Sequence, residues 1–287
     1  MNRVWLLTGA SRGLGRAIAE TVLAAGDRLL AGVRDPQTLA DLADRYPETL
    51  RVATLEVTDP AAGEAAVAAA LDAWGRLDVL VNNAGYGHIM PFEQMADADF
   101  RAQLETNFFG VVNLTRAVVP VMRRQRSGHI FQVSSVGGRI GNPGLSAYQA
   151  AKWAVGGFTE VLAQELAPLG IRVTALEPGG MRTQWGATAQ GATPELWPEY
   201  RPAMEPIQAL LAGIIGKETG DPAKVARVIL ALAGHPNPPV HLLLGSDAVH
   251  YCGLMDGARA AAGEHWKAVS LAVDFGAPEV LPALPEA

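Results

Sequence analysis

The 287-residue sequence has a single cysteine, Cys252, and that scarcity excludes several classes of protein. One thiol cannot form an internal disulfide or a thiolate metal cluster, so we interpret Cys252 as a small buried or half-buried apolar side chain. The six histidines are scattered, without H-E-x-x-H or another metal-ligand spacing, and we expect no metal site.

Long apolar runs and long basic runs are also missing. No apolar stretch reaches membrane-spanning length, and Met1 leads directly into an apolar strand without the three regions of a secretion signal. The formal net charge is −6, and the short basic cluster Arg123, Arg124 and Arg126 stands where a long helix should end, so the helix dipole accounts for it. We therefore expect a cytoplasmic protein with neither a membrane nor a nucleic acid as partner.

Short apolar runs alternate with amphipathic segments from Val4 to Leu244, a pattern that predicts βαβ units. Continuous apolar runs are typical of parallel strands that are buried on both faces. We expect an α/β fold, a doubly wound Rossmann-type parallel sheet of about seven strands with helices on both faces, in a single domain. The predicted strands are residues 4–8, 28–33, 50–57, 78–84, 129–135, 171–178 and 241–245.

Helix starts are marked by Asp followed by Pro at Asp35, Asp59 and Asp221. An Asp side chain accepts bonds from the free amides of a first turn while Pro sets the first helical φ, so each Asp is a predicted N-cap. Asp97 is a fourth predicted cap, before a long helix that runs to about Arg123.

No internal repeat or flexible linker divides the chain. We expect residues 1–250 to form a dinucleotide-binding and catalytic domain, with an excursion at 184–220 that covers the substrate. Residues 251–287 are expected to be a C-terminal extension that packs on this domain or on a neighbouring subunit.

The first predicted strand ends in the turn TGASRGLG, in which Gly9, Gly13 and Gly15 follow the spacing G-x-x-x-G-x-G. Glycines there let the backbone approach a pyrophosphate, which the next helix N-terminus stabilises. The spacing differs from the common G-x-G-x-x-G, and a tight turn without a ligand is the alternative. Gly-Lys-Ser/Thr never appears, which excludes a P-loop.

Arg34 ends the second predicted strand, nineteen residues after Gly15. Val33 precedes it, where a carboxylate would be expected to hold a free ribose 2′-hydroxyl, whereas a guanidinium binds a 2′-phosphate bidentately. Arg12 adds a second positive charge, and Asp35 is interpreted as the N-cap before Pro36. The pattern indicates NADP(H), with NADPH preferred over NADH.

Tyr148 and Lys152 lie four residues apart, so on a helix their side chains share one face. An ammonium beside a phenol favours the phenolate and would lower the phenol pKa toward neutrality. Ser135 would add a neutral hydrogen-bond donor from the end of the preceding strand. Such Tyr/Lys pairs are common on helix surfaces by chance, so the catalytic interpretation depends on the nucleotide site.

Six motifs then occur in a familiar order. They are the glycine turn, NNAG from Asn82 to Gly85, Asn107, Ser135, YQAAK from Tyr148 and PGGMRT from Pro178. With them the chain resembles the short-chain dehydrogenase/reductase family, in its main single-domain subgroup, over residues 1 to about 250. The resemblance implies hydride transfer between a nicotinamide and a carbonyl or alcohol.

The resemblance also implies a role for each catalytic residue. Tyr148 would protonate the carbonyl oxygen, and Lys152 would lower the pKa of that phenol and bind the nicotinamide ribose. Ser135 would hold the substrate oxygen, while Asn107 would bind a water that connects Lys152 to solvent. Hydride transfer develops negative charge on that oxygen, so two donors beside it are physically reasonable.

The cofactor-binding residues that we expect come from six segments. They are Gly9, Ser11, Arg12, Gly13, Leu14, Gly15, Arg34, Glu56, Val57, Asn83, Ala84, Gly85, Tyr148, Lys152, Pro178, Gly179 and Thr183. Glu56 departs from the family pattern, which has Asp beside the adenine, whereas the backbone of Val57 would lie there in either case.

The excursion carries large apolar side chains, among them Trp185, Trp197, Tyr200 and Met204. They indicate a hydrophobic ketone as substrate, or else simply pack the loop onto the sheet. His88 would either border this pocket or have no role. The tail lacks the Gly-rich ending of tetrameric family members, which favours a dimer or a monomer. We expect a homodimer, with a tetramer as a further alternative.

The predicted function is an NADPH-dependent carbonyl reductase for hydrophobic ketones, reversibly an alcohol dehydrogenase. A non-catalytic NADP(H)-binding sensor or scaffold of the same fold is the alternative. A serine hydrolase is excluded because the stretch from Gly144 to Tyr148 lacks the second glycine of G-x-S-x-G.

Overall fold

A seven-stranded parallel sheet forms the centre of the single domain in the computed structural model, which describes residues 2–191, 194–276 and 280–285. The strand order is β3-β2-β1-β4-β5-β6-β7, so the winding direction reverses between β1 and β4. The strands are β1 Val4–Thr8, β2 Arg28–Val33, β3 Leu50–Thr54, β4 Val79–Asn82, β5 Gly128–Val133, β6 Ile171–Pro178 and β7 His241–Leu244. In such sheets a crevice opens at the carboxyl ends of the two strands where the order reverses.

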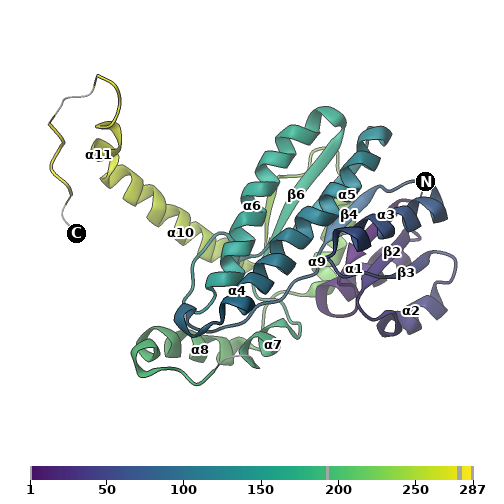
Figure 1. Ribbon diagram of the computed structural model, residues 1–287, viewed down its shortest axis with the longest axis horizontal. Helices are drawn as coiled ribbons and strands as arrows, with labels where there is room; N and C mark the ends of the chain where they lie inside the picture. The colour runs from purple at the N-terminus through teal and green to yellow at the C-terminus, as the bar shows by residue number, and fades with distance from the viewer. Residues whose placement is uncertain (1, 192–193, 277–279, 286–287) are drawn as a thin grey trace.

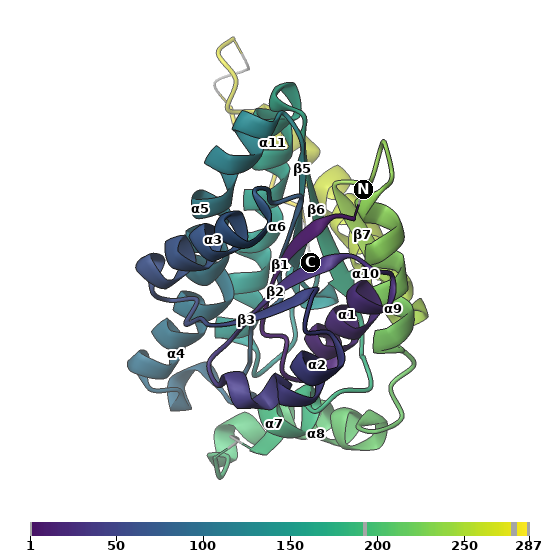
Figure 2. The same cartoon turned by 90° about the vertical axis from the view of Figure 1, so that its right-hand side faces the viewer.

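Helices cover both faces of this sheet, as Figure 2 shows. On one face lie α1 Gly13–Ala24, α2 Ala40–Arg45 and α9 Pro222–Ala233, and on the other α3 Pro60–Trp74, α5 Gly110–Gln125 and α6 Ser146–Leu166. The remaining α-helices are α4 Asp97–Leu104, α7 Trp185–Gly191, α8 Arg201–Ile214, α10 Ser246–His265 and α11 Lys267–Leu271. In the described ranges, none of the helices could cross a membrane, since none is both long and apolar enough.

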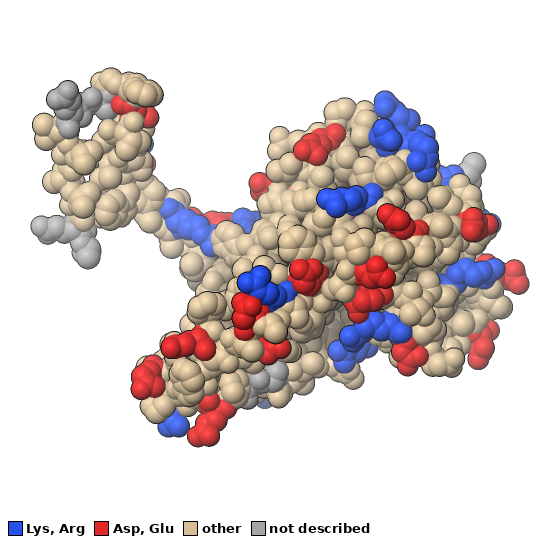
Figure 3. Space-filling model, in the orientation of Figure 1, with Lys and Arg blue, Asp and Glu red and all other residues tan. Residues whose placement is uncertain are grey.

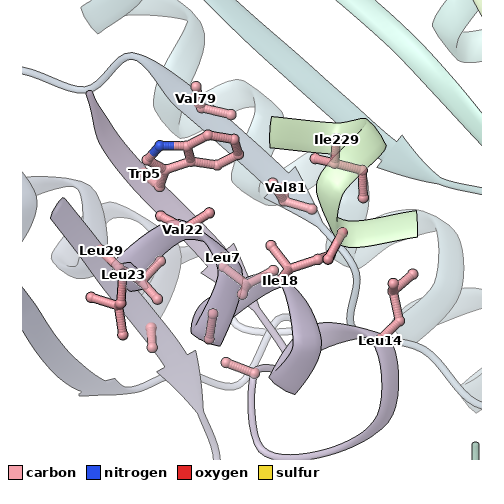
Figure 4. Close-up of a cluster of buried hydrophobic side chains, with 14 of the residues drawn as sticks. Trp5, Leu7, Leu14, Ile18, Val22, Leu23, Leu29, Val79, Val81 and Ile229 are labelled. Atoms are coloured by element: carbon pink, nitrogen blue, oxygen red, sulfur yellow. The ribbon is translucent and has the colours of Figure 1, made fainter. Parts of the chain in front are cut away.

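The alternation of side chains along β1 supplies both cores. Trp5 and Leu7 point to the face of α1 and α9, where Ile18 and Ile229 meet them (Figure 4), while Leu6 points to the face of α3 and α5. Both faces of the central strand are therefore buried away from solvent, as the continuous apolar run predicts.

Three of the four predicted N-caps are confirmed. The side chain of Asp35 accepts a bond from Gln37 N (3.0 Å) at the 3₁₀ helix η1 Pro36–Leu39, and Asp59 and Asp221 cap α3 and α9 in the same way. The prediction for Asp97 is wrong, because it is the first residue of α4 and its carboxylate pairs with Arg101 at 2.7 Å.

The predicted long helix is present but is not regular. Between α4 and α5 the residues Glu105–Phe109 form a π-helical turn, η3, which contains Asn107. Turns of this kind interrupt the regular series of hydrogen bonds along an α-helix and are frequent at functional sites.

The predicted strands run too far at their carboxyl ends. The third ends at Thr54 instead of residue 57, the fourth at Asn82 instead of 84, and the fifth at Val133 instead of 135. Single backbone bonds continue past two of these ends, from Leu55 N to Val33 O and from Ser134 N to Leu176 O, both at 2.8 Å, but the regular pairing of the strands stops before them.

The C-terminal part of the chain leaves the domain as a long helix (Figure 1). The expected boundary at residue 250 falls inside α10, whose buried Ala248 and Cys252 pack against the domain before the helix projects outward. Residues 192–193 of the predicted excursion and 277–279 and 286–287 of the predicted extension lie outside the described residues.

Candidate active site

Ser135, Tyr148 and Lys152 come together at the carboxyl edge of β5. Ser135 caps the 3₁₀ turn η4 Val136–Gly138, and its Oγ accepts a bond from Gly137 N at 3.0 Å. Ser135 lies close enough to the Tyr148 hydroxyl to act on its pKa, which it lowers. One turn along α6, Lys152 Nζ lies 5.7 Å from the centre of the Tyr148 ring and donates to Val133 O at 2.7 Å. The structure thus assembles the predicted triad.

Burial dominates the electrostatics of this triad. Tyr148 is 9% exposed and Lys152 4% exposed. Burial raises the pKa of Tyr148 to about 12, with the Ser135 hydrogen bond acting in the opposite direction, and lowers the pKa of Lys152 to about 8. The expected lowering of the phenol pKa is therefore not found, because the ammonium faces the ring and desolvation of the phenolate is the larger effect.

Asn107 holds the turn beside Lys152. Its Nδ2 donates to Tyr86 O (2.7 Å) and to Gln103 O (2.9 Å), and its Oδ1 accepts from Tyr86 N (3.0 Å). A Cβ atom on Gly85 would lie 2.5 Å from Asn107 Oδ1 and 3.6 Å from Lys152 Nζ. Asn107 and Lys152 therefore face the same spot in the crevice.

The glycine turn after β1 is tightly wound and tied to the end of β4. Gly9 and Gly13 have φ values of +69° and +55°, and a side chain on Gly15 would collide with the Gly9 carbonyl. Asn83 Nδ2 donates to Thr8 O (3.0 Å) and to Gly9 O (3.1 Å). The turn and the NNAG motif therefore form one unit at the switch point of the sheet.

The PGGMRT segment after β6 closes onto the same turn. A Cβ on Gly13 would lie 3.4 Å from Thr183 Cβ, and Arg12 Nη1 lies 3.5 Å from Gln184 Oε1. The structure thus brings together three predicted cofactor-binding segments that are far apart in sequence. A small hollow lies beside them, lined by Thr8, Val57, Asn82, Ala84, Thr106, Gly110 and Val111.

The other predicted cofactor residues differ in how exposed their side chains are. Arg34 is exposed beyond the end of β2, whereas the Leu14 side chain is buried in the core and leaves only its backbone toward the turn. Ser11 is half-buried in the turn. Glu56 accepts from Thr58 N and Thr58 Oγ1, both at 3.2 Å, so its carboxylate is held locally.

Asp247, in the first turn of α10, is a residue that sequence reasoning missed. Its Oδ2 accepts from Gly180 N at 2.7 Å, and a side chain on Gly179 would overlap its carboxylate. Asp247 therefore fixes the segment that follows Pro178. Nothing in the sequence marks this Asp, because its partner is a backbone amide 67 residues away.

The excursion packs against the open side of Tyr148. The rings of Tyr148 and Trp185 lie 5.0 Å apart, and Ile89, Leu145 and Met204 complete an apolar cluster with them. Trp197 is instead largely exposed. Trp185 and Met204 thus lie beside the phenol of Tyr148. The backbone N–H of His88 donates a hydrogen bond to Gln103 Oε1 at 3.1 Å.

Comparisons with known proteins agree with this geometry. The sequence profile described as short chain dehydrogenase matches residues 3–192. An oxidoreductase, BOA17 of Botryotinia fuckeliana, is 45% identical over 273 residues, which is 95% of this chain and 99% of the relative. A short-chain dehydrogenase structure from Streptomyces avermitilis matches with a TM-score of 0.86 and 39% identity, covering 96% of this chain and 99% of that one.

A metagenomic short-chain oxidoreductase solved in complex with NADP matches with a TM-score of 0.67 and 27% identity over 84% of this chain and 96% of that one. The profile match spans well over half of the sequence, and the sheet, the glycine turn and the grouping of Ser135, Tyr148 and Lys152 agree with it. The chain is therefore an oxidoreductase that belongs to the short-chain dehydrogenase family.

Proposed function

We propose that the protein is an NADPH-dependent carbonyl reductase that acts on hydrophobic ketones and, in reverse, on secondary alcohols. The observation that carries the proposal is the set of Ser135, Tyr148 and Lys152 at one edge of the sheet, with Lys152 Nζ 5.7 Å from the ring of Tyr148 and both of these side chains buried. A hydroxyl, a phenol and an ammonium in this arrangement suit the protonation of a carbonyl oxygen.

The residues around the crevice fit a dinucleotide. The glycine turn stands at the N-terminus of α1, and the close contact of Gly15 with the Gly9 carbonyl keeps the turn tight enough for its backbone to approach a pyrophosphate. When bound there, the cofactor supplies the hydride, and the protein supplies orientation and a proton.

Ser135 and Tyr148 would share the substrate oxygen. Ser135 Oγ already accepts from Gly137 N, so its own O–H stays available to donate. Tyr148, whose pKa is raised to about 12, is protonated at neutral pH and so carries the proton that reduction consumes. As negative charge develops, both hydroxyls donate to the same oxygen atom.

Lys152 would help to return a proton to Tyr148 after each turnover and would hold the cofactor ribose. One of its three N–H bonds goes to Val133 O, which leaves two for the ribose and for a water. Both amide hydrogens of Asn107 are engaged, so a bridging water would bond to the remaining lone pair of Asn107 Oδ1 or to its main-chain carbonyl.

The preference for NADPH over NADH rests on exposed guanidiniums. Arg12 lies in the turn and Arg34 follows β2, and Asp35, the carboxylate next to Arg34 in sequence, caps η1. A 2′-phosphate therefore meets two cations and no free carboxylate on the same segment. The NADP bound to the metagenomic family member supports this choice.

The preference for a hydrophobic ketone rests on the wall beside Tyr148. Trp185, Met204 and Leu145 form an apolar cluster with Tyr148, which favours a bulky apolar substituent on the ketone. A non-catalytic sensor is not favoured, since a sensor has no need of a buried proton donor.

The test is NADPH consumption by the purified full-length protein against a panel of steroids, quinones, aryl ketones and β-keto esters. We expect turnover with at least one apolar ketone class and a higher kcat/KM with NADPH than with NADH. Tight NADPH binding with no oxidation across the panel would overturn the proposal in favour of the sensor.

A further inference from the structure

The two halves of the proposed active site lie on segments that separate where the sheet ends. Ser135 follows β5, and the segment that begins at Pro178 follows the body of β6. The last backbone bond between these neighbouring strands runs from Ser134 N to Leu176 O at 2.8 Å. In the part of the chain that the structure describes, no backbone–backbone hydrogen bond joins the Ser135 turn to residues 178–183. Side-chain contacts therefore determine how far apart the two segments lie.

Arg139 and Glu177 form an ion pair that links these two segments. Arg139 ends the 3₁₀ turn that Ser135 caps, and its backbone N–H donates to Val136 O at 2.9 Å. Glu177 is the residue before Pro178. Arg139 Nη1 donates to Glu177 Oε2 at 3.3 Å. A side-chain bond thus connects the turn of one strand end to the segment at the other, where the backbone makes no such connection.

Burial makes the carboxylate of Glu177 depend on its partners. The side chain is only 1% exposed, and its other oxygen, Oε1, lies 2.7 Å from His241 Nδ1 on β7. Both carboxylate oxygens therefore have a nitrogen partner, as a buried charge requires. Movement of Arg139 away from Glu177 would leave a buried charge poorly compensated, so the position of the guanidinium relative to β6 is strongly restrained.

Arg139 also contacts the beginning of the projecting helix α10, where Figure 3 shows basic and acidic side chains side by side. Arg139 Nη2 pairs with Asp256 Oδ2 at 3.1 Å, and Arg259 Nη2 donates to the main-chain oxygen of Arg139. The side chain of Asp256 is 49% exposed, so this pair restrains Arg139 much less than the buried pair does. Asp256 therefore offers an internal comparison, because it is a second carboxylate on the same arginine that does not lead to the site.

We infer that Arg139 is a positioning residue for hydride transfer, which through Glu177 holds the Ser135 turn at a fixed distance from the segment that begins at Pro178. The inference rests on the proposed function, in which Ser135 binds the substrate oxygen and the Pro178 segment lies at the nicotinamide. A displacement of about 1 Å between two reactants can lower the rate about 100-fold. Arg139 acts on neither reactant directly, so its whole effect passes through the two segments that it connects.

A positioning ion pair and a purely structural one differ in what their loss changes. Without a structural pair the protein melts at a lower temperature, but the molecules that remain folded transfer hydride at the wild-type rate. Without a positioning pair the single-turnover rate falls in fully folded protein. The primary deuterium isotope effect on that rate also changes, because it depends on the distance between the carbon atoms that donate and accept the hydride. The inference predicts the second result.

The first experiment measures single turnovers of the full-length protein by stopped flow, with NADPH and with NADPH deuterated at the transferred position. In Arg139→Met we expect the rate to fall by about 50-fold and the Kd for NADPH to stay within about threefold. The double variant Arg139→Met, Glu177→Gln avoids an unpaired buried carboxylate and should show the same loss, because the link is absent in both. Arg139→Lys should recover part of the rate, and Asp256→Asn should stay within about twofold of the wild type.

A rate within about twofold of the wild type in the double variant, an unchanged isotope effect, or an equal loss in Asp256→Asn would each overturn the inference. Circular dichroism at the assay temperature confirms that the variants are folded. A second experiment needs no turnover and so separates this inference from the proposed function. In the NADPH-bound double variant, amide hydrogen exchange should accelerate in residues 135–140 and 178–183 together, and in Asp256→Asn in neither. If the wild-type protein reduces no ketone, the proposed function fails, and unchanged exchange in either segment then overturns the positioning role as well.

Discussion

Lys152 and Arg34 are both cations that we expect to bind the same dinucleotide, yet the structure places them in opposite surroundings. Lys152 is buried in α6, bonded to Val133 O, and its pKa is lowered to about 8. Arg34 stands in solvent past the end of β2. Burial makes a charge adjustable and suits proton transfer, whereas exposure leaves a guanidinium free to select a phosphate. The catalytic end therefore depends on desolvation and the phosphate end on accessible charge.

Removing the buried phenol tests the catalytic end most strongly. Tyr148→Phe deletes the proton donor but keeps the ring that stacks near Trp185, so we expect kcat to fall by about 10³-fold. The Kd for NADPH, measured by fluorescence, should hardly change because the exposed arginines are intact. Retention of a large part of the wild-type kcat would reject Tyr148 as the acid.

The cost of burying Lys152 should be visible as a pH dependence of stability. Its pKa is about 8 in the folded protein and 10.5 for a fully solvated lysine, so the unfolded chain holds the extra proton between these values and stability rises with pH. The wild-type protein should gain about 2 kcal/mol relative to Lys152→Met between pH 7.5 and 9.5.

Urea denaturation at the two pH values provides that measurement. Most other titrating groups are the same in both proteins, so their contributions largely cancel in the difference. Parallel pH profiles for the two proteins would show that Lys152 is better solvated than the structure indicates, and the contrast with Arg34 would lose its basis.

At the exposed end, Arg34→Ala should raise the KM for NADPH by about tenfold and leave the KM for NADH nearly unchanged. The reason is that only NADPH carries the 2′-phosphate. Arg45→Ala, an exposed arginine at the end of α2, is the matched control. Equal effects of Arg34→Ala on both cofactors would remove the phosphate-recognition role.

Variants of Asp247 test whether a residue that belongs neither to the buried catalytic end nor to the exposed phosphate end positions the cofactor site. Asp247→Ala removes the acceptor for Gly180 N and should weaken NADPH binding by about fivefold, while Asp247→Asn keeps an acceptor oxygen and should lose less. Titration calorimetry of both variants gives the comparison. Equal losses in Ala and Asn would show that charge, not the hydrogen bond, matters.

The sequence was most informative where a local rule applies. The N-caps at Asp35, Asp59 and Asp221 depend only on neighbouring residues, and the order of apolar runs predicts the sheet. The positions of Tyr148 and Lys152 on one helix face follow from their spacing in the same way.

Features that depend on distant contacts could not be predicted. The raised pKa of Tyr148 reflects burial by segments from several elements, and the role of Asp247 depends on an amide 67 residues away. The π-helical turn at Asn107 has no sequence signature, and the projection of α10 beyond the domain depends on how Asp256 and Arg259 anchor it.

The place of β1 in the sheet also has a consequence for how the chain folds. β1 precedes β2, β3 and β4 in the chain, yet it lies between β2 and β4, and its partner Val79 follows Trp5 by more than seventy residues. The apolar run of β1 therefore remains without one neighbour until β4 has been synthesised, which favours slow folding and exposure to aggregation. Chaperone dependence during synthesis is thus expected to be concentrated in the interval between the synthesis of β1 and that of β4.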